Sequence, residues 1–235
     1  MTVFDAVRAI VPRPLRPIVR SAHRKYTLWR TLPAVIADPA CLLANSRQIS
    51  DLLHGWGNES FSPGEEYIRG CVSSALTADG PILECGSGLT TLLLGAVAQR
   101  SQTEVWTLEH DQAWSRRVTR VLSRYGIRSV RICLSPLRDY GEFTWYAPPL
   151  EAMPSRFSLV VCDGPPGDTP GGRYGLVPIM KERLTTGCKI LLDDAVRTEE
   201  RSIAARWALE LRTDYAVHGS TAPYIELGVP SERPA

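Results

Sequence analysis

From residue 81 onward, short apolar runs typical of strands alternate with longer amphipathic segments typical of helices. The segments predicted as strands are residues 81–85, 104–109, 130–134, 158–162 and 189–192. Those predicted as helices are residues 90–100, 113–125, 174–184 and 199–211. This alternation predicts a parallel sheet with helices on both faces, because parallel neighbours must be joined by a long crossover.

The alternation stops near the carboxyl end of the chain. Residues 214–218 and 224–229 both have the pattern of strands, and only a short link separates them. Two strands joined so closely must run antiparallel, since a parallel return needs about a dozen residues or more. We therefore expect an α/β sheet that is parallel except for its last strand.

The first predicted strand leads into a glycine-rich turn. Its apolar run reaches the acid Glu84, the turn Gly86-Ser87-Gly88 follows, and a helix is expected to start near Thr90. Glycines let the backbone turn sharply and approach a ligand closely, and the free N–H groups of a helix start attract an anionic group. A strand, turn and helix of this kind predict a site for a nucleotide-like cofactor.

Two details of the turn separate the cofactor classes. A dinucleotide site has a third glycine three residues after the second, and this chain has Thr91 there. This disfavours the alternative of a dinucleotide-dependent oxidoreductase. Glu84 precedes the turn, and an acid at that position suits a cofactor that carries positive charge, such as a sulfonium.

Five short motifs extend the comparison over residues 60–230. They are LECGSG at 83–88, WY at 145–146, CDGPP at 162–166, GGRYG at 171–175 and LLDDAVRTEE at 191–200. With them the chain resembles class I S-adenosylmethionine-dependent methyltransferases, and in particular bacterial O-methyltransferase-like proteins. The resemblance implies a Rossmann-like, doubly wound, seven-stranded sheet with an antiparallel last strand. It also implies S-adenosyl-L-methionine as cofactor and in-line methyl transfer to an oxygen of a small molecule or glycan.

The resemblance assigns the acid at the end of the second strand, Glu109, to the ribose hydroxyls of the cofactor. His110 follows it directly, and Ser135 stands where related proteins often have an acid for the adenine amine. The turns after the first and fourth strands are expected to face each other across the cofactor. The predicted cofactor residues are Glu84, Gly86, Ser87, Gly88, Thr90, Glu109, His110, Ser135 and Asp163.

Three residues are candidates for catalysis. Asp163 and Asp194 match two acids that hold a divalent ion in catechol-type enzymes, but Ala195 replaces the expected asparagine, so Mg²⁺ or Mn²⁺ dependence is left open. Either acid could instead remove the acceptor proton. The structural alternatives are that Asp163 forms a turn before Gly164 and that Asp194 caps the next helix. Arg173, in a Gly/Pro-rich loop, is suited to bind a carboxylate or phosphate on the substrate.

Charge is distributed unevenly along the chain. Residues 1–30 carry a net charge of +6 and the remainder carries −4. An acidic body disfavours nucleic acid as a partner. The basic segment is broken by Pro12, Pro14 and Pro17, so it is not one continuous helix. It is suited to lie on an anionic membrane surface, to pack on the body or to form a partly ordered arm. We expect a basic N-terminal helical extension at residues 1–58 and a methyltransferase domain at 59–235.

The remaining composition predicts a cytoplasmic protein, with peripheral membrane contact through the basic segment as an option. No apolar stretch reaches the length of a membrane span, and the six cysteines have no C-x-x-C spacing. The main alternative to an enzyme is a non-catalytic cofactor-binding or scaffold protein. The sequence does not indicate the oligomeric state or the acceptor.

Overall fold

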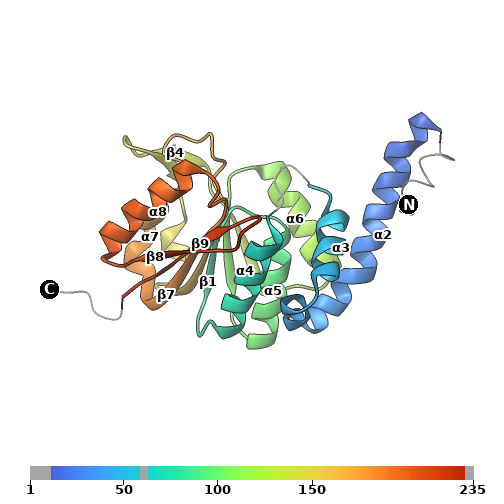
Figure 1. The fold of residues 1–235 in the computed structure, drawn as a ribbon, viewed down its shortest axis with the longest axis horizontal. Coiled ribbons are helices and arrows are strands. Elements are labelled where there is room, and N and C mark those ends of the chain that lie inside the picture. Colours follow the sequence, from blue (N-terminus) through green and yellow to red (C-terminus); the bar gives the residue numbers. More distant parts are fainter. Residues whose placement is uncertain (1–11, 59–62, 231–235) are drawn as a thin grey trace.

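The computed structural model describes residues 12–58 and 63–230, and its centre is a seven-stranded sheet (Figure 1). The strand order is β3-β2-β1-β6-β7-β9-β8. These strands are β1 (Ile82–Cys85), β2 (Val105–Glu109), β3 (Val130–Leu134), β6 (Phe157–Cys162), β7 (Leu184–Leu192), β8 (Tyr215–His218) and β9 (Tyr224–Gly228). Each overlaps a predicted strand, although β7 begins five residues before the predicted range of 189–192.

Strand pairing confirms the Rossmann-like topology. β1 pairs in parallel with β2 and with β6, and the parallel region continues to β3 and β7. β9 lies antiparallel between β7 and β8, so the predicted antiparallel last strand is present. Strand order reverses at β1, whose neighbours are β2 and β6. Ligands of open α/β sheets bind beyond the strand ends at this point.

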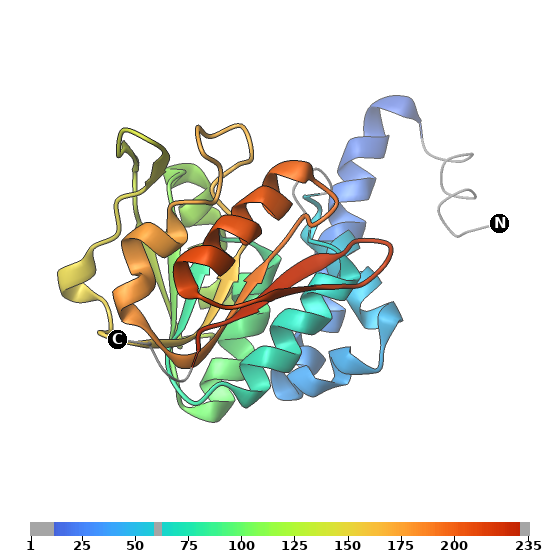
Figure 2. The ribbon, with the colours of Figure 1, turned by 60° about the vertical axis from the view of Figure 1, so that its left-hand side comes forward.

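Helices cover both faces of the sheet, as Figure 2 shows. Alternate residues of β1 point to opposite sides, so Ile82 belongs to one apolar cluster and Leu83 to the other. The first cluster includes residues of α4 (Glu65–Thr77), α5 (Leu89–Ser101) and α6 (Gln112–Arg124). The second includes residues of α7 (Leu176–Met180) and α8 (Thr198–Leu211). The sheet is therefore wound on both sides.

The N-terminal extension is helical in its described part. A short 3-10 turn, η1 (Arg13–Leu15), leads into the long helix α2 (Arg16–Ala37), and η2 (Pro39–Leu43) and α3 (Ser46–Trp56) follow. Residues 1–11, at the start of the basic segment, lie outside the described part of the chain.

Apolar side chains fix α2 to the body. Leu28, Leu32 and Val35 share a face of the helix and lie in the same apolar cluster as residues of α4 and α5. Pro17 is the second residue of α2, where its missing N–H breaks no helical hydrogen bond. The second half of the basic segment is therefore helical and packs on the body, which was one of the predicted alternatives, and it is not a partly ordered arm. The boundary between residues 58 and 59 stays a prediction.

A small hairpin lies above the carboxyl end of the sheet and was not predicted. It consists of β4 (Leu137–Asp139) and β5 (Thr144–Tyr146), which are too short to show a clear alternation. Trp145 and Tyr146 are fully buried, so they pack in the core. The helix predicted at residues 174–184 is shorter than expected, because η5 (Lys181–Arg183) and β7 occupy its second half. A further short turn, η4 (Leu150–Ala152), precedes β6.

Two expectations concern the whole chain. All six cysteines are free thiols, and three of the four that lie in strands are buried: Cys85, Cys162 and Cys188. Within residues 12–58 and 63–230, no helix combines the length and the hydropathy needed to cross a bilayer.

Candidate functional site

The turns that follow β1 and β6 meet at the carboxyl edge of the sheet. Gly86 has φ of +87°, which favours glycine, and a Cβ on it would lie 3.1 Å from the Gly164 nitrogen. A Cβ on Gly164 would in turn lie 2.9 Å from the Gly86 Cα. The contact of these two glycines confirms that the two turns face each other.

Gly88 lies in the same turn but under different constraints. Its φ of 178° is extended backbone open to any residue, and an added Cβ would meet no protein atom within 4 Å. The Gly88 N–H donates to the Thr91 hydroxyl (2.8 Å), which closes the first turn of α5. Nothing within the protein therefore requires glycine at this position. A ligand lying against the turn would require it.

Glu84 is fully buried beneath the turn. Its carboxylate accepts hydrogen bonds from the hydroxyls of Thr90 (2.6 Å), Thr91 (2.8 Å) and Thr107 (2.8 Å). These bonds join β1 to the start of α5 and to β2. The roles predicted for Glu84 and Thr90 toward a cofactor stay predictions, and the three hydrogen bonds indicate that Glu84 fixes the turn.

Burial raises the pKa of Glu84 to about 7, even though the three threonine hydroxyls favour the ionised form. The unfolded chain has the ordinary value of 4.5 and releases the proton first as the pH rises. Folding stability contributed by this group is therefore greatest below pH 4.5 and declines until about pH 7, by about 3 kcal/mol.

We predict that Glu84→Gln removes this part of the pH dependence. Urea unfolding of the wild type and the variant between pH 4.5 and pH 8 measures it, as the difference between the two free-energy curves. Glu151→Gln, on the exposed turn η4, serves as a matched control that should leave the curve unchanged. A Glu84→Gln curve parallel to that of the wild type would contradict the assigned pKa.

The carboxylate of Glu109, at the end of β2, is tied to the glycine turn. Its Oε2 accepts from the Ser87 N–H (3.1 Å) and the Ser87 hydroxyl (2.6 Å), and its Oε1 accepts from the Asp111 N–H (2.8 Å). A carboxylate has about four acceptor positions, so at least one remains for a ligand. The side chain is 5% exposed and thus largely shielded from water.

His110 and Ser135 lie beside Glu109. The Nδ1 atom of His110 is 3.3 Å from Glu109 Oε1, and its ring is 6.2 Å from that of Tyr146. Ser135 donates its N–H to the Glu109 carbonyl (2.7 Å) and its hydroxyl to the Cys133 carbonyl (3.2 Å). Both residues are therefore at the predicted edge, although the Ser135 side chain is buried. Their contacts with a cofactor stay predictions.

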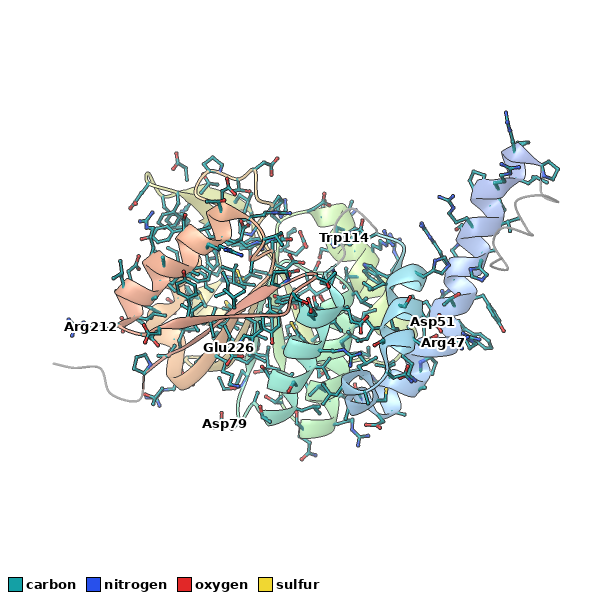
Figure 3. All side chains as sticks on the ribbon, in the orientation of Figure 1. Arg47, Asp51, Asp79, Trp114, Arg212 and Glu226 are labelled. Carbon is teal, nitrogen blue, oxygen red and sulfur yellow. The ribbon has the colours of Figure 1, made fainter. Side chains whose placement is uncertain are left out.

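Trp114 is a residue of this site that the sequence did not indicate. It stands in the first turn of α6, between α6 and α3 (Figure 3), and its indole N–H donates to the Ser87 carbonyl (2.7 Å). The indole also contacts Trp56 edge to face, with ring centroids 5.9 Å apart. A lone aromatic near a predicted helix start gives no sequence signal for such a contact.

The three predicted catalytic residues converge on one another. The Arg173 guanidinium donates to Asp163 Oδ1 (3.0 Å), to Asp194 Oδ2 (2.8 Å) and to the Asp193 carbonyl (3.0 Å). Glu200, which the sequence analysis did not single out, is 3.7 Å away. Arg173 is 3% exposed; its Nη1 and Nη2 donate to protein oxygens, while its buried Nε has no hydrogen-bond partner. Its predicted contact with a substrate anion stays a prediction.

Asp194 has φ of +63°, a left-handed conformation that aspartate tolerates better than most residues. The N-cap of α8 is Arg197, so Asp194 does not cap that helix. Burial raises the pKa of Asp163 to about 6, against the opposing effect of Arg173. Burial and the neighbouring Asp163 raise the pKa of Asp193 to about 8.

This arrangement does not fit a divalent ion between Asp163 and Asp194. The guanidinium already lies between the two carboxylates, where a second cation would be repelled. No group of three or more histidine, cysteine or acidic side chains within residues 12–58 and 63–230 is arranged to hold a metal.

We therefore predict that a chelator leaves the activity of the protein unchanged. Turnover measured after dialysis against EDTA should equal that of the untreated protein, and added Mg²⁺ or Mn²⁺ should not increase it. Loss of turnover on chelation, with recovery on adding either ion, would contradict this prediction and show that a metal is needed for activity.

Sequence comparisons identify no relatives of this chain. No protein-family model matches it, and no curated protein matches it.

Comparison of structures identifies proteins with the same fold. An O-methyltransferase from Bacillus cereus in complex with S-adenosylhomocysteine is 14% identical, with a TM-score of 0.58 over 83% of this chain and 97% of that one. A precorrin-6y C5,15-methyltransferase from Geobacter metallireducens is 16% identical, with a TM-score of 0.53 over 74% and 96%. A methyltransferase of Podospora anserina bound to S-adenosylhomocysteine is 16% identical, with a TM-score of 0.52 over 93% and 97%. At these identities the likeness is one of fold.

Proposed function

We propose that this protein is an S-adenosylmethionine-dependent methyltransferase that methylates an oxygen of a small molecule or glycan. One observation carries the proposal. A buried carboxylate, Glu109, is tied to a glycine turn in which Gly88 has open space where a side chain would lie. The two meet at the carboxyl edge of the sheet, beside the point where strand order reverses. The fold shared with three methyltransferases supports the same proposal.

The residues present fit this cofactor. Glu109 keeps an acceptor position for a ribose hydroxyl, and Gly88 lets the backbone approach the ligand. The first turn of α5 offers N–H groups to a carboxylate. When bound, S-adenosylmethionine supplies a methyl group activated by its sulfonium. The chain's own task is then to orient the acceptor and remove its proton.

Asp163 is the proposed general base. It is half-buried at the end of β6, and its pKa of about 6 leaves it ionised at neutral pH while keeping it a useful proton acceptor. Arg173 holds Asp163 and Asp194 in place, because its Nη2 donates to both carboxylates and its Nη1 donates to the Asp193 carbonyl. Arg173 is thus a positioning residue.

Thr91 argues against a dinucleotide cofactor in this turn. Its hydroxyl accepts from the Gly88 N–H and donates to Glu84, so the side chain is part of the turn's own hydrogen bonding. A dinucleotide site has glycine there to allow close approach of helix and strand. A glycine at this position would have no hydroxyl to make these two hydrogen bonds.

Binding of the demethylated cofactor tests the proposal first. We expect S-adenosylhomocysteine to bind the wild type in calorimetry, and Glu109→Gln to weaken that binding by about tenfold, because one charge-assisted hydrogen bond is lost. Glu104→Gln, just before the opposite end of β2, is the matched control and should bind normally.

Three outcomes would count against the proposal. Absence of S-adenosylhomocysteine binding would remove its basis, and binding of NAD in its place would favour an oxidoreductase. Cofactor binding without turnover over a broad panel of hydroxyl acceptors would favour a non-catalytic scaffold.

A further inference from the structure

The first turns of α2 extend beyond α3 at the edge of the molecule (Figures 1 and 2). Between them, the end of α3 and α6 lies a groove with a volume of about 490 Å³. Its walls come from η1, α2, α3 and α6, which are brought together only by the tertiary fold. The volume is in the range of small-molecule sites.

The groove is strongly basic. Six of its lining residues are cationic, and none of the described residues that line it is acidic. The six are Arg13, Arg16, Arg20, Arg24, Lys25 and Arg117. Cations gathered in one concave site repel one another and raise the local concentration of anions, so the site suits a ligand with several negative charges.

One wall of the groove adjoins the cofactor turn. The Arg117 guanidinium lies 4.6 Å from the Trp114 ring centroid and 5.2 Å from that of Trp56, and it donates to the Trp56 carbonyl (2.9 Å). The Trp114 indole in turn donates to the Ser87 carbonyl. A single aromatic ring therefore separates the groove from the glycine turn. The groove and the proposed cofactor turn are thus connected through the Trp114 side chain.

We propose that this groove binds a diphosphate group on the methyl acceptor. Arginine guanidinium groups match the geometry of phosphate oxygens, and five of the six cations are arginines. The groove has the size of a small ligand, and the rest of the chain is acidic, so a nucleic acid strand does not fit the charge distribution. The inference rests on the proposed function, since it names a feature of the acceptor.

Two sources of a diphosphate are chemically equivalent in the groove: a soluble nucleoside diphosphate derivative and the headgroup of an isoprenoid lipid. The opposite face of α2 bears on this choice. Ile18, Tyr26 and Trp29 are each more than half exposed there, at positions that share one side of the helix. Apolar and aromatic residues of this kind are suited to the interface of a membrane.

Calorimetry with inorganic pyrophosphate tests the groove directly, using the full chain at low ionic strength. We expect pyrophosphate to bind the wild type, and Arg20→Ala to weaken binding by about tenfold through loss of one charge-assisted contact. Arg120→Ala, an exposed arginine of α6 outside the groove, is the matched control and should bind as the wild type does. Added salt should weaken binding in the wild type.

Absence of pyrophosphate binding, or equal weakening by both substitutions, would overturn the proposal. S-adenosylhomocysteine binding measured on the same samples keeps the two ideas apart. If S-adenosylhomocysteine binds and pyrophosphate does not, the groove assignment fails and the methyltransferase proposal stands. Where pyrophosphate does bind, uridine diphosphate and vesicles with an isoprenoid diphosphate are tested separately, one for each source of the diphosphate. Binding of either one, lost in Arg20→Ala, supports the proposal and identifies the source.

Discussion

Replacing Arg173 by methionine should destabilise the protein by about 3–5 kcal/mol, the usual consequence of removing one partner from a buried ion pair. The guanidinium is 3% exposed and lies among Asp163, Asp194 and Glu200. Methionine fills a similar space but leaves the three carboxylates facing one another without a cation. Urea unfolding at pH 8 measures the loss as a shift in midpoint.

The pH dependence separates this effect from simple loss of packing. Without the guanidinium, which lowers them, the folded-state pKa values of Asp163 and Glu200 rise further above those of the unfolded chain. Part of the loss in Arg173→Met should therefore be recovered as the pH is lowered to about 5.5. Arg206→Met is the matched control, since Arg206 makes an ion pair with Glu142 on the surface and is 47% exposed. Its substitution should cost less than about 1 kcal/mol. A loss in Arg173→Met that stays the same at both pH values would contradict the ion-pair explanation.

Replacing Gly88 by alanine should abolish most cofactor affinity while leaving the fold intact. The extended backbone at this position accepts an L-residue, and the added methyl group meets no protein atom within 4 Å. We expect the free energy of unfolding to change by less than about 1 kcal/mol, the scale of a changed helix cap. Affinity for S-adenosylhomocysteine should fall by about 5- to 150-fold, since overpacking by one methyl group commonly costs about 1–3 kcal/mol.

Gly86→Ala serves as the comparison, because we expect it to lower the stability of the fold more than the affinity for the cofactor. A left-handed backbone costs an L-residue about 1–2 kcal/mol, and the new Cβ would press on Gly164 at 3.1 Å. Instability without a specific binding defect is therefore the expected result at Gly86. If Gly88→Ala binds S-adenosylhomocysteine as tightly as the wild type, the turn does not hold the cofactor.

The sheet was predictable from the sequence because its strands are short, apolar and separated by turn residues. The buried run at 158–162, for example, has no competing helical period, and it forms β6 with a difference of one residue. The hairpin of β4 and β5 was missed for the opposite reason. Three-residue strands carry too little alternation to show a period, and this pair is defined by its antiparallel register.

The N-terminal helices were harder to predict because local and tertiary preferences conflict there. Proline inside a helix costs about 3 kcal/mol, yet α2 contains Pro33 in its interior. Burial of Leu28, Leu32 and Val35 offsets that cost, and it depends on α4 and α5, which are distant in the sequence. A spacing of three and four between these apolar residues was the signal available.

At the site, the sequence could name residues but not their partners. Asp163 and Asp194 follow strands, so their meeting at one edge of the sheet was predictable. Arg173 lies in a loop whose path no local pattern fixes, so its position between the two acids could not be inferred. The same limit applies to Trp114, because its indole reaches Ser87 only after α6 has packed against the sheet.

The shared core of α2, α3, α4 and α5 has a consequence for how this protein can be divided. Leu32, Leu52 and Trp56 occupy the same apolar cluster as Ile68 and Leu93. A recombinant fragment that begins at residue 59 would lack these helices and expose the apolar faces of α4 and α5 to solvent. We expect such a fragment to aggregate. Exchange of the first 58 residues between homologous chains would likewise need matching changes on α4 and α5.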